Sequence, residues 1–179
     1  MRPMFGRPFR RGIGPNIPPM LQRANQLMAA QDYAGAASAF EQLAKAAEGR
    51  GGPRAPFFYL QAGRARIFAG QIPAGVAHLQ YGLNLFATRN QPGKIFNQGN
   101  RIVAELNQRG LTAEAGQITN LMKSLVPAFK AMSESVHNKK AALPTHCPGC
   151  GAPVRPDEVD WLDDVTAECA FCGSPVRGN

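Results

Sequence analysis

Apolar residues recur at intervals of three and four over most of the chain, which is the spacing of amphipathic helices. Between residues 20 and 140 this pattern is dominated by Ala, Leu, Gln and Met. Gly, Pro and Asn interrupt it at residues 49–53 and 90–93, with shorter breaks near residues 30–32, 70–71 and 110. The pattern predicts about six helices of three to four turns, arranged as three antiparallel pairs. A shorter helix is predicted near 128–139, after Pro127.

Three side chains indicate where individual helices begin. Asp32 and Thr112 belong to the residue types that cap helix N-termini, because their side-chain oxygens accept hydrogen bonds from free backbone N–H groups. Pro73 suits a first helical turn, where its missing N–H is not needed. We therefore expect one helix to begin close to each of these positions.

The helix pairs repeat with a period of 39 to 40 residues. The three copies read QDYxxAxxxF from Gln31, GQIxxGxxxL from Gly70 and GLTxxAxxxT from Gly110. A small residue four positions before a bulkier one lets the preceding helix approach closely, and stacked pairs of this kind share one core.

These copies resemble the tetratricopeptide repeat, whose second helix opens with Gly-Asp-Tyr-x-x-Ala-x-x-x-Phe, a pattern close to residues 31–40. The first helix of that family carries Trp-x2-Leu-Gly-x2-Tyr, which Tyr59, Ala62 and Gly63 match in part. The period here is longer than the 34 residues of the family. The resemblance implies a mainly α fold over residues 20–140, built as an array of antiparallel helix pairs.

The resemblance also implies a concave groove, lined by the first helix of each pair, that holds a peptide or protein partner. Apolar groove positions such as Leu21, Leu60 and Ile67 are better explained as core. The polar candidates for partner binding are Asn25, Arg64, Asn100 and Asn107. Amide side chains can clamp a peptide backbone as paired donors and acceptors, although the same residues are equally well explained as ordinary surface positions.

Residues 1–19 lack helical spacing and predict a flexible arm. Five prolines block regular structure there, and the segment carries four arginines and two phenylalanines. Basic arms with aromatic residues can contact nucleic acid, acidic proteins or a membrane surface. An arm without any partner explains the composition equally well.

The only four cysteines of the chain stand near its C-terminus, in the related phrases CPGCGAPVR and CAFCGSPVR. The spacing CxxC-x18-CxxC is typical of a zinc site, because two thiolates two residues apart reach one ion when the chain turns tightly between them. The sequence predicts one structural zinc ion in a small β zinc ribbon, residues 147–179, after a linker at 141–146. Its ligands are Cys147, Cys150, Cys169 and Cys172, and His146 is interpreted as a flanking residue.

Other uses of paired cysteines fit less well. Disulfides are disfavoured because no secretory signal marks the chain, and a thioredoxin-like motif needs a single CxxC in a βαβ context. A rubredoxin-type iron site has the same four-sulfur geometry as zinc, and spacing does not separate the two. A segment this short needs metal to fold, with metal binding worth on the order of 10 kcal/mol. Serine at Cys150 or Cys169 is therefore expected to unfold the ribbon and leave the helices nearly intact.

Charge is divided unevenly along the chain. Residues 1–146 carry 18 Lys and Arg against 6 Asp and Glu, or +12, whereas residues 147–179 carry 2 against 6, or −4. Affinity for phosphate comes from Lys and Arg, so the acidic ribbon is charged against nucleic acid. Its acids serve either solubility or docking on a basic surface, which belongs to this chain's own helices or to a partner.

Three functions of different classes remain. No nucleophile, base and orienting group can be named together, so catalysis is not expected. The favoured function is a protein-interaction adaptor, similar to small bacterial proteins that join such repeats to a terminal zinc ribbon. The alternatives are a nucleic-acid- or ribosome-associated protein and a rubredoxin-like electron carrier. A cytoplasmic location is expected, since the sequence has no apolar run of 18 residues and no secretory signal.

Overall fold

The computed structural model describes residues 18–126, 141–156, 159–162 and 165–178. This part of the chain is mainly helical, with a small antiparallel sheet near the C-terminus, as the sequence predicts at that level. The helices are α1 (Pro19–Ala29), α2 (Tyr33–Glu48), α3 (Ala55–Phe68), α4 (Ile72–Thr88), α5 (Pro92–Gln108) and α6 (Thr112–Leu125), and the strands are β1 (Asp160–Trp161), β2 (Thr166–Glu168) and β3 (Pro175–Arg177). Residues 1–17 of the expected arm and the helix expected near 128–139 lie outside the described residues, and Pro19 opens α1 instead of ending the arm.

The turns inside the three helix pairs have the same geometry. Gln31, Gly70 and Gly110 adopt positive φ angles of 61°, 78° and 75°. In each turn the N–H of the next residue donates to a carbonyl five residues earlier, over 2.9 Å. This hydrogen bond satisfies carbonyls that the end of a helix leaves free. Glycine adopts positive φ without steric cost. Gln31 adopts the same conformation although it has a Cβ atom, which makes positive φ less favourable.

All three expected helix starts are confirmed, since α2, α4 and α6 begin at Tyr33, Ile72 and Thr112. The Asp32 carboxylate accepts a hydrogen bond from the Gly35 N–H over 2.9 Å at the start of α2, and a proline lies in the first turn of α4. Thr112 was wrongly expected to be a cap. It is the first residue of α6, no side chain caps this helix, and the preceding Leu111 packs against the core.

The backbones of α3 and α4 come into close contact. A Cβ atom placed on Gly63 would lie 2.8 Å from the Gly75 carbonyl oxygen, and one placed on Gly75 would lie 2.7 Å from the Gly63 carbonyl oxygen. Real Cβ atoms do not come so near to oxygen, so both helices depend on glycine at the crossing. The small residue of the second sequence copy therefore has the packing role expected for it.

Two apolar clusters hold the molecule together. One lies among α3, α4, α5 and α6 and contains the fully buried Phe57, Phe86 and Met122. The other lies among α1, α2 and α3, and it also includes the four cysteines and Val176 of β3. The segment that carries the cysteines therefore shares an apolar core with the first three helices.

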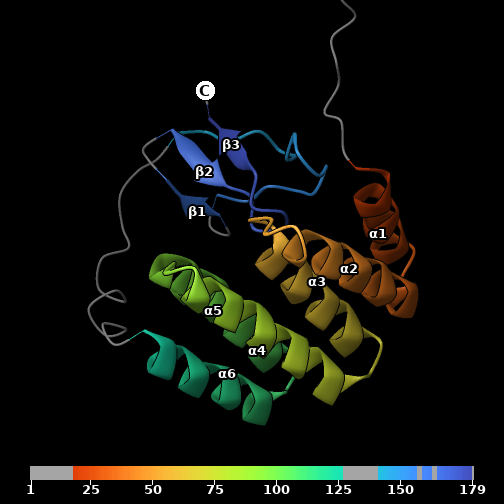
Figure 1. Ribbon diagram of the computed structural model, residues 1–179, viewed down its shortest axis with the longest axis vertical. Coiled ribbons are helices and arrows are strands. Elements are labelled where there is room, and N and C mark those ends of the chain that lie inside the picture. Colours follow the sequence, from red (N-terminus) through yellow and green to blue (C-terminus); the bar gives the residue numbers. More distant parts are fainter. Residues whose placement is uncertain (1–17, 127–140, 157–158, 163–164, 179) are drawn as a thin grey trace, which may run out of the picture.

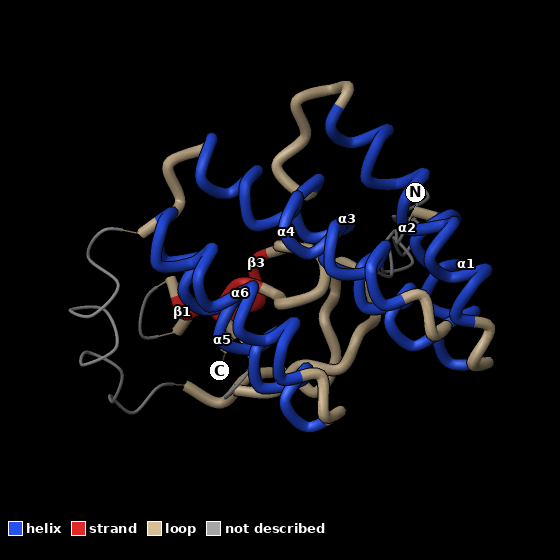
Figure 2. Tube along the Cα trace, turned by 90° about the horizontal axis from the view of Figure 1, so that it is seen from below, coloured by secondary structure: helices blue, strands red, loops and turns tan. Residues whose placement is uncertain are grey.

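The sheet has the strand order β1-β2-β3, and Ala167 in β2 pairs with Trp161 in β1 and Val176 in β3. Figure 1 shows the sheet on one side of α5 and α6 on the other side, and in Figure 2 the same molecule is seen from the α6 side, with the strands behind. None of the helices in the described ranges is long and apolar enough to cross a membrane.

Candidate metal centre

Each cysteine pair is held in a tight turn. In the first turn, the Cys147 N–H donates to the Ala152 carbonyl over 2.8 Å, and the Gly151 N–H donates to the Cys147 carbonyl over 2.8 Å. The Gly149 N–H points at Cys147 Sγ, 3.3 Å away. Gly151 has φ of 72°, a conformation that glycine adopts readily. The turn thus presents both sulfur atoms of its CxxC to the same side.

The second pair repeats these contacts almost bond for bond. The Cys169 N–H donates to the Ser174 carbonyl over 2.8 Å, the Gly173 N–H to the Cys169 carbonyl over 2.9 Å, and the Phe171 N–H to Cys169 Sγ over 3.4 Å. Gly173 has φ of 70°. The two similar cysteine motifs of the sequence therefore fold into two similar turns.

The two turns bring four sulfur atoms together. All four Sγ atoms lie within 4.8 Å of one another, with 3.8 Å between Cys147 and Cys172 and 3.8 Å between Cys150 and Cys169. A tetrahedral thiolate site with metal–sulfur bonds of about 2.3 Å spaces its sulfur atoms by about 3.8 Å. Each cysteine is at most 2% exposed, and none forms a disulfide. This cluster could hold a metal ion such as zinc, and iron accepts the same ligands.

Hydrogen bonds among the thiols disturb their acidity strongly. The bond with Cys150 lowers the pKa of Cys147 to about 7, and the bond with Cys147 holds the pKa of Cys172 far below its usual value. The bond with Cys147 is also the largest cause of the raised pKa values of Cys150 and Cys169. The four thiols therefore differ in how readily they lose a proton. A dication would allow all four to be deprotonated.

Two neighbours of the cluster complete its description. Ser174, which is buried, places its Oγ 3.2 Å from Cys172 Sγ and helps to lower the pKa of that thiol. His146 is exposed, and its Nδ1 lies 3.1 Å from the Thr145 hydroxyl. Among the described residues that could ligate a metal, the cluster contains the four cysteines and not this histidine.

The C-terminal segment, a name used here for the described residues from 141 to 178, docks on the helices through polar contacts as well. Asn25 of α1 donates from Nδ2 to the Cys150 carbonyl over 2.9 Å. Lys94 of α5 lies 2.7 Å from the Glu168 carboxylate, whose side chain is 8% exposed. At least one acid of the segment therefore docks on a basic residue of the chain's own helices.

Asp160 is a second acid at this contact, and it faces Glu168 across the β1–β2 pair. It is 7% exposed, and its Oδ2 has no hydrogen-bond partner among the described residues. Burial raises the pKa of Asp160 from its ordinary value of 3.8 to about 6, and the negative charge of Glu168 adds to the effect. Hydrogen bonds from Asn97 and Gln98 and the charge of Lys94 oppose it. Above pH 6 the segment therefore docks with an incompletely compensated charge.

Replacing Asp160 with asparagine is expected to stabilise the protein at pH 8 and to have less effect at lower pH. Because the folded-state pKa is raised, folding favours the protonated acid. The free-energy cost of burying the ionised Asp160 carboxylate is absent below pH 3.8, grows as the pH rises towards 6, and reaches its full size above pH 6. The shift of about two units corresponds to ~3 kcal/mol.

The measurement is the free energy of unfolding in urea between pH 5.5 and 8 for both proteins. Their difference cancels the pH dependence that metal binding gives to both. Glu114→Gln is the control, because it measures how the free energy of unfolding changes when a carboxylate elsewhere in the chain is removed. A difference between Asp160→Asn and the parent that does not grow with pH would contradict the expected charge burial.

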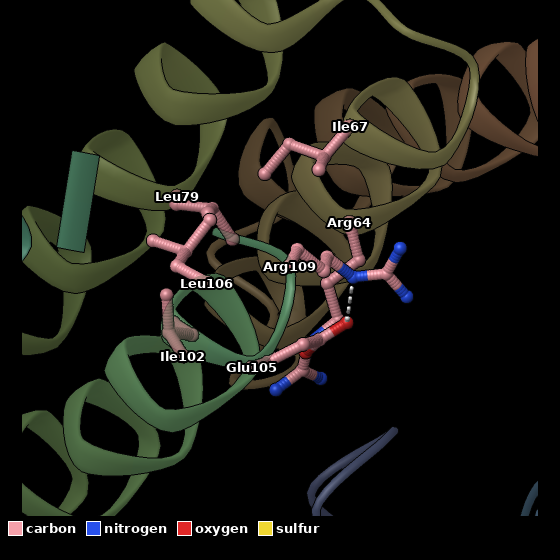
Figure 3. A pocket seen from close by; sticks show the side chains of 7 residues that line it. All are labelled: Arg64, Ile67, Leu79, Ile102, Glu105, Leu106 and Arg109. Atoms are coloured by element: carbon pink, nitrogen blue, oxygen red, sulfur yellow. Dashed lines mark hydrogen bonds and ion pairs between the residues drawn. The ribbon is translucent and has the colours of Figure 1, made fainter. Parts of the chain in front are cut away.

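The four polar groove candidates differ in their surroundings. Asn25 contacts the C-terminal segment, as described. Arg64 is buried, and its Nε donates to Glu105 Oε2 over 2.9 Å, while its two terminal nitrogens have no partner among the described residues (Figure 3). Asn100 and Asn107 are exposed on α5. Leu21, Leu60 and Ile67 are buried, as expected for core positions.

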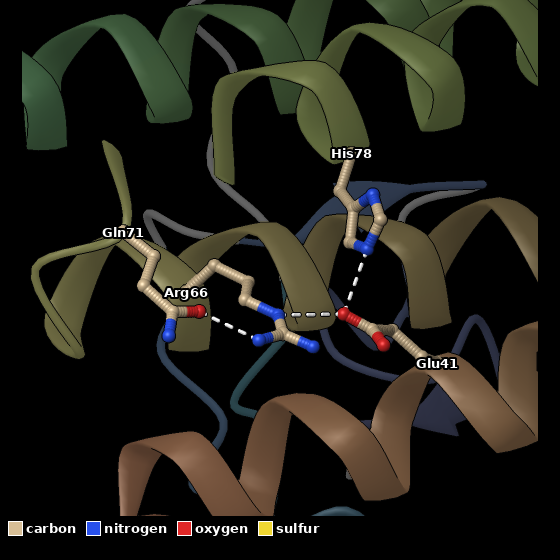
Figure 4. Close-up of polar contacts among 4 residues, drawn as sticks. All are labelled: Glu41, Arg66, Gln71 and His78. Carbon is tan, nitrogen blue, oxygen red and sulfur yellow. Dashed lines mark hydrogen bonds and ion pairs between the residues drawn. The ribbon is translucent and has the colours of Figure 1, made fainter. Parts of the chain in front are cut away.

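A polar cluster that joins three helices was missed from the sequence. Glu41 of α2 accepts from Arg66 Nε of α3 over 2.7 Å and lies 2.8 Å from His78 Nε2 of α4 (Figure 4). Burial raises the pKa of Glu41, but hydrogen bonds from Arg66 and His78 outweigh it and hold that pKa below its ordinary value. The partners are 25 and 37 residues from Glu41, so no local spacing indicates them.

A second carboxylate on α2 is bound in a related way. Glu48 accepts from the Tyr81 hydroxyl over 2.6 Å and from the Tyr59 hydroxyl over 2.7 Å, and both bonds lower its pKa. The two rings pack edge to face with centroids 4.7 Å apart. These contacts tie α2 to α3 and α4.

No family model, no curated protein and no solved structure matches the chain.

Proposed function

We propose that this chain is a non-catalytic protein-interaction adaptor whose helical repeats are braced by a structural zinc ribbon. The observation that carries the proposal is the buried cluster of four cysteine sulfur atoms, which belongs to the same apolar core as α1, α2 and α3. A closed set of four thiolates leaves no position for water or substrate, so its role is to hold structure.

Metal content tests the first half of the proposal. Protein purified without added metal is expected to contain one zinc ion per chain and to be colourless. The Cys147→Ser/Cys172→Ser double variant should contain none. Stoichiometric iron with a reversible redox couple would instead support an electron carrier, and absence of any metal in the parent would reject the centre.

The helical half of the proposal is supported by the recurrent turns and by charge. The turns with positive φ at Gln31, Gly70 and Gly110 are spaced by 39 and 40 residues, in keeping with a tetratricopeptide-like array. The C-terminal segment contacts Asn25 of α1 and Lys94 of α5, but Asn100 and Asn107 of α5 are exposed and remain open to a partner. The positive charge of residues 1–146 favours an acidic partner, and the acidic residues between the two CxxC pairs disfavour nucleic acid in that role.

Affinity capture with three forms of the full chain tests this surface. A protein partner is expected to be retained by the parent and by the exposed control Gln117→Ala, and to be lost with Asn100→Ala/Asn107→Ala. Capture that is equal for all three forms would place the partner elsewhere. Binding of generic RNA or DNA with an affinity that falls steeply with salt would favour the nucleic-acid function instead.

A further inference from the structure

The helices carry a docking surface that the chain's own C-terminal segment covers. We define the covered surface by Asn25 of α1, Phe57 of α3, and Lys94 and Arg101 of α5. Lys94 Nζ lies 5.4 Å from the centre of the Phe57 ring, so a cation stands beside an aromatic face. The second cation, Arg101, lies over the Phe171 ring at 5.1 Å. This surface suits a ligand that brings negative charge together with an aromatic ring.

The C-terminal segment brings that combination. Glu168 binds Lys94, and Phe171, three residues later, packs under Arg101. Between these contacts and β3, Gly173 lies so close to the Phe57 ring that a Cβ atom there would come within 2.5 Å of it. The contacting unit is therefore a short Glu-x-x-Phe segment on a surface of two cations and one ring.

The same contact contains an unfavourable element. Two carboxylates, Asp160 and Glu168, face one ammonium group, Lys94, and Asp160 Oδ2 is buried without a partner in the described part of the chain. A buried charge with incomplete pairing opposes the contact that contains it. Burial of Asp160 thus partly offsets the favourable contacts of Glu168 and Phe171. The fold of the C-terminal segment therefore depends on the metal centre.

We propose that the covered surface is an interaction site for an acidic partner segment of the form Glu-x-x-aromatic, and that the metal-bound C-terminal segment occupies it as an internal competitor. Loss of the metal unfolds the competitor and opens the site. The proposal rests on the zinc half of the proposed function. It does not depend on Asn100 or Asn107.

Reaction of lysine amines with an acetylating reagent, read by mass spectrometry, tests whether the site opens. In the full chain, removal of metal by a chelator is expected to raise the reactivity of Lys94 about tenfold, because its hydrogen bonds to a carboxylate are lost. The exposed Lys45 and Lys123 serve as internal controls and should not change. Unchanged reactivity of Lys94, or loss of amide protection throughout the helices, would overturn the proposal.

Binding of two synthetic peptides tests the class of partner. A fluorescent Ala-Glu-Ala-Ala-Phe-Ala peptide is expected to bind the metal-free chain at least about tenfold more tightly than the metal-loaded chain. The same peptide with Gln in place of Glu should bind neither form. Lys94→Gln should weaken binding about tenfold, and the exposed control Arg23→Gln should not.

The outcomes separate this proposal from the one before it. Equal binding of the peptide to both forms of the chain, or no dependence on Lys94, overturns the internal competitor even if the adaptor surface at Asn100 and Asn107 is confirmed. Retention of a partner through Asn100 and Asn107 would leave these results unaffected.

Discussion

Replacing Cys150 with serine is expected to abolish metal binding and to unfold the C-terminal segment. Removing one of four thiolates breaks a closed tetrahedral set, and the folding energy supplied by such sites is on the order of 10 kcal/mol. The four cysteines are each at most 2% exposed within a core shared with α1, α2 and α3. The helices should therefore keep most of their far-UV circular dichroism while losing support at that core.

Two measurements separate these effects. Metal analysis should show less than one tenth of the zinc of the parent. The helical melting temperature should fall by about 10 °C, as expected for the loss of a few kcal/mol of packing. Leu162→Ser is the matched control, because Leu162 is 58% exposed on the same segment. Loss of most of the helical signal at 25 °C would mean that the helices cannot fold without the segment, and normal metal content would reject Cys150 as a ligand.

Replacing Phe57 with alanine is expected to reduce the free energy of unfolding by about 3–5 kcal/mol, the cost of truncating a buried phenylalanine. Phe57 is 1% exposed and packs edge to face on Phe86, with ring centroids 5.0 Å apart. It also contacts Gly173, so the cavity would open where the helical core meets the C-terminal segment.

Urea unfolding followed by circular dichroism measures this change. Leu162→Ala, at an exposed position, should change the free energy of unfolding by less than about 0.5 kcal/mol. The acetylation rate of Lys94 should also rise in Phe57→Ala, because the ring beside its ammonium group is gone. A loss of less than about 1 kcal/mol would show that the core closes around the missing ring and that Phe57 does not join the two parts of the fold.

The cysteine cluster was predictable because its information is local. Each CxxC and the glycine that follows fold into a turn through hydrogen bonds within six residues, and the repeated phrase indicates that two such turns serve one ion. The helix boundaries were predictable for the same reason: Asp32 caps its own helix, and Gly70 and Gly110 end theirs with positive φ. Thr112 shows the limit, since its residue type allows a cap and the packing of Leu111 places the helix start one residue earlier.

The groove residues were less predictable because spacing on a helix fixes a face and not what covers it. Asn25 and Arg64 are on the expected helices, but Asn25 binds the Cys150 carbonyl and Arg64 pairs with Glu105. The division into helices and ribbon as separate domains stays a prediction, which the Cys150→Ser experiment addresses.

By itself the sequence determined the helices, their recurrent turns and the two cysteine turns, because each depends on residues a few positions apart. Only the tertiary structure decided that Glu41 binds both Arg66 and His78. It also decided that Glu168 binds Lys94 and that Asp160 is buried next to Glu168. The contacts of Glu41 and of Glu168 with Lys94 join residues from 25 to 74 positions apart. The charge of such residues indicates that they need partners when buried, but the packing of the helices and the sheet determines which partner each one meets.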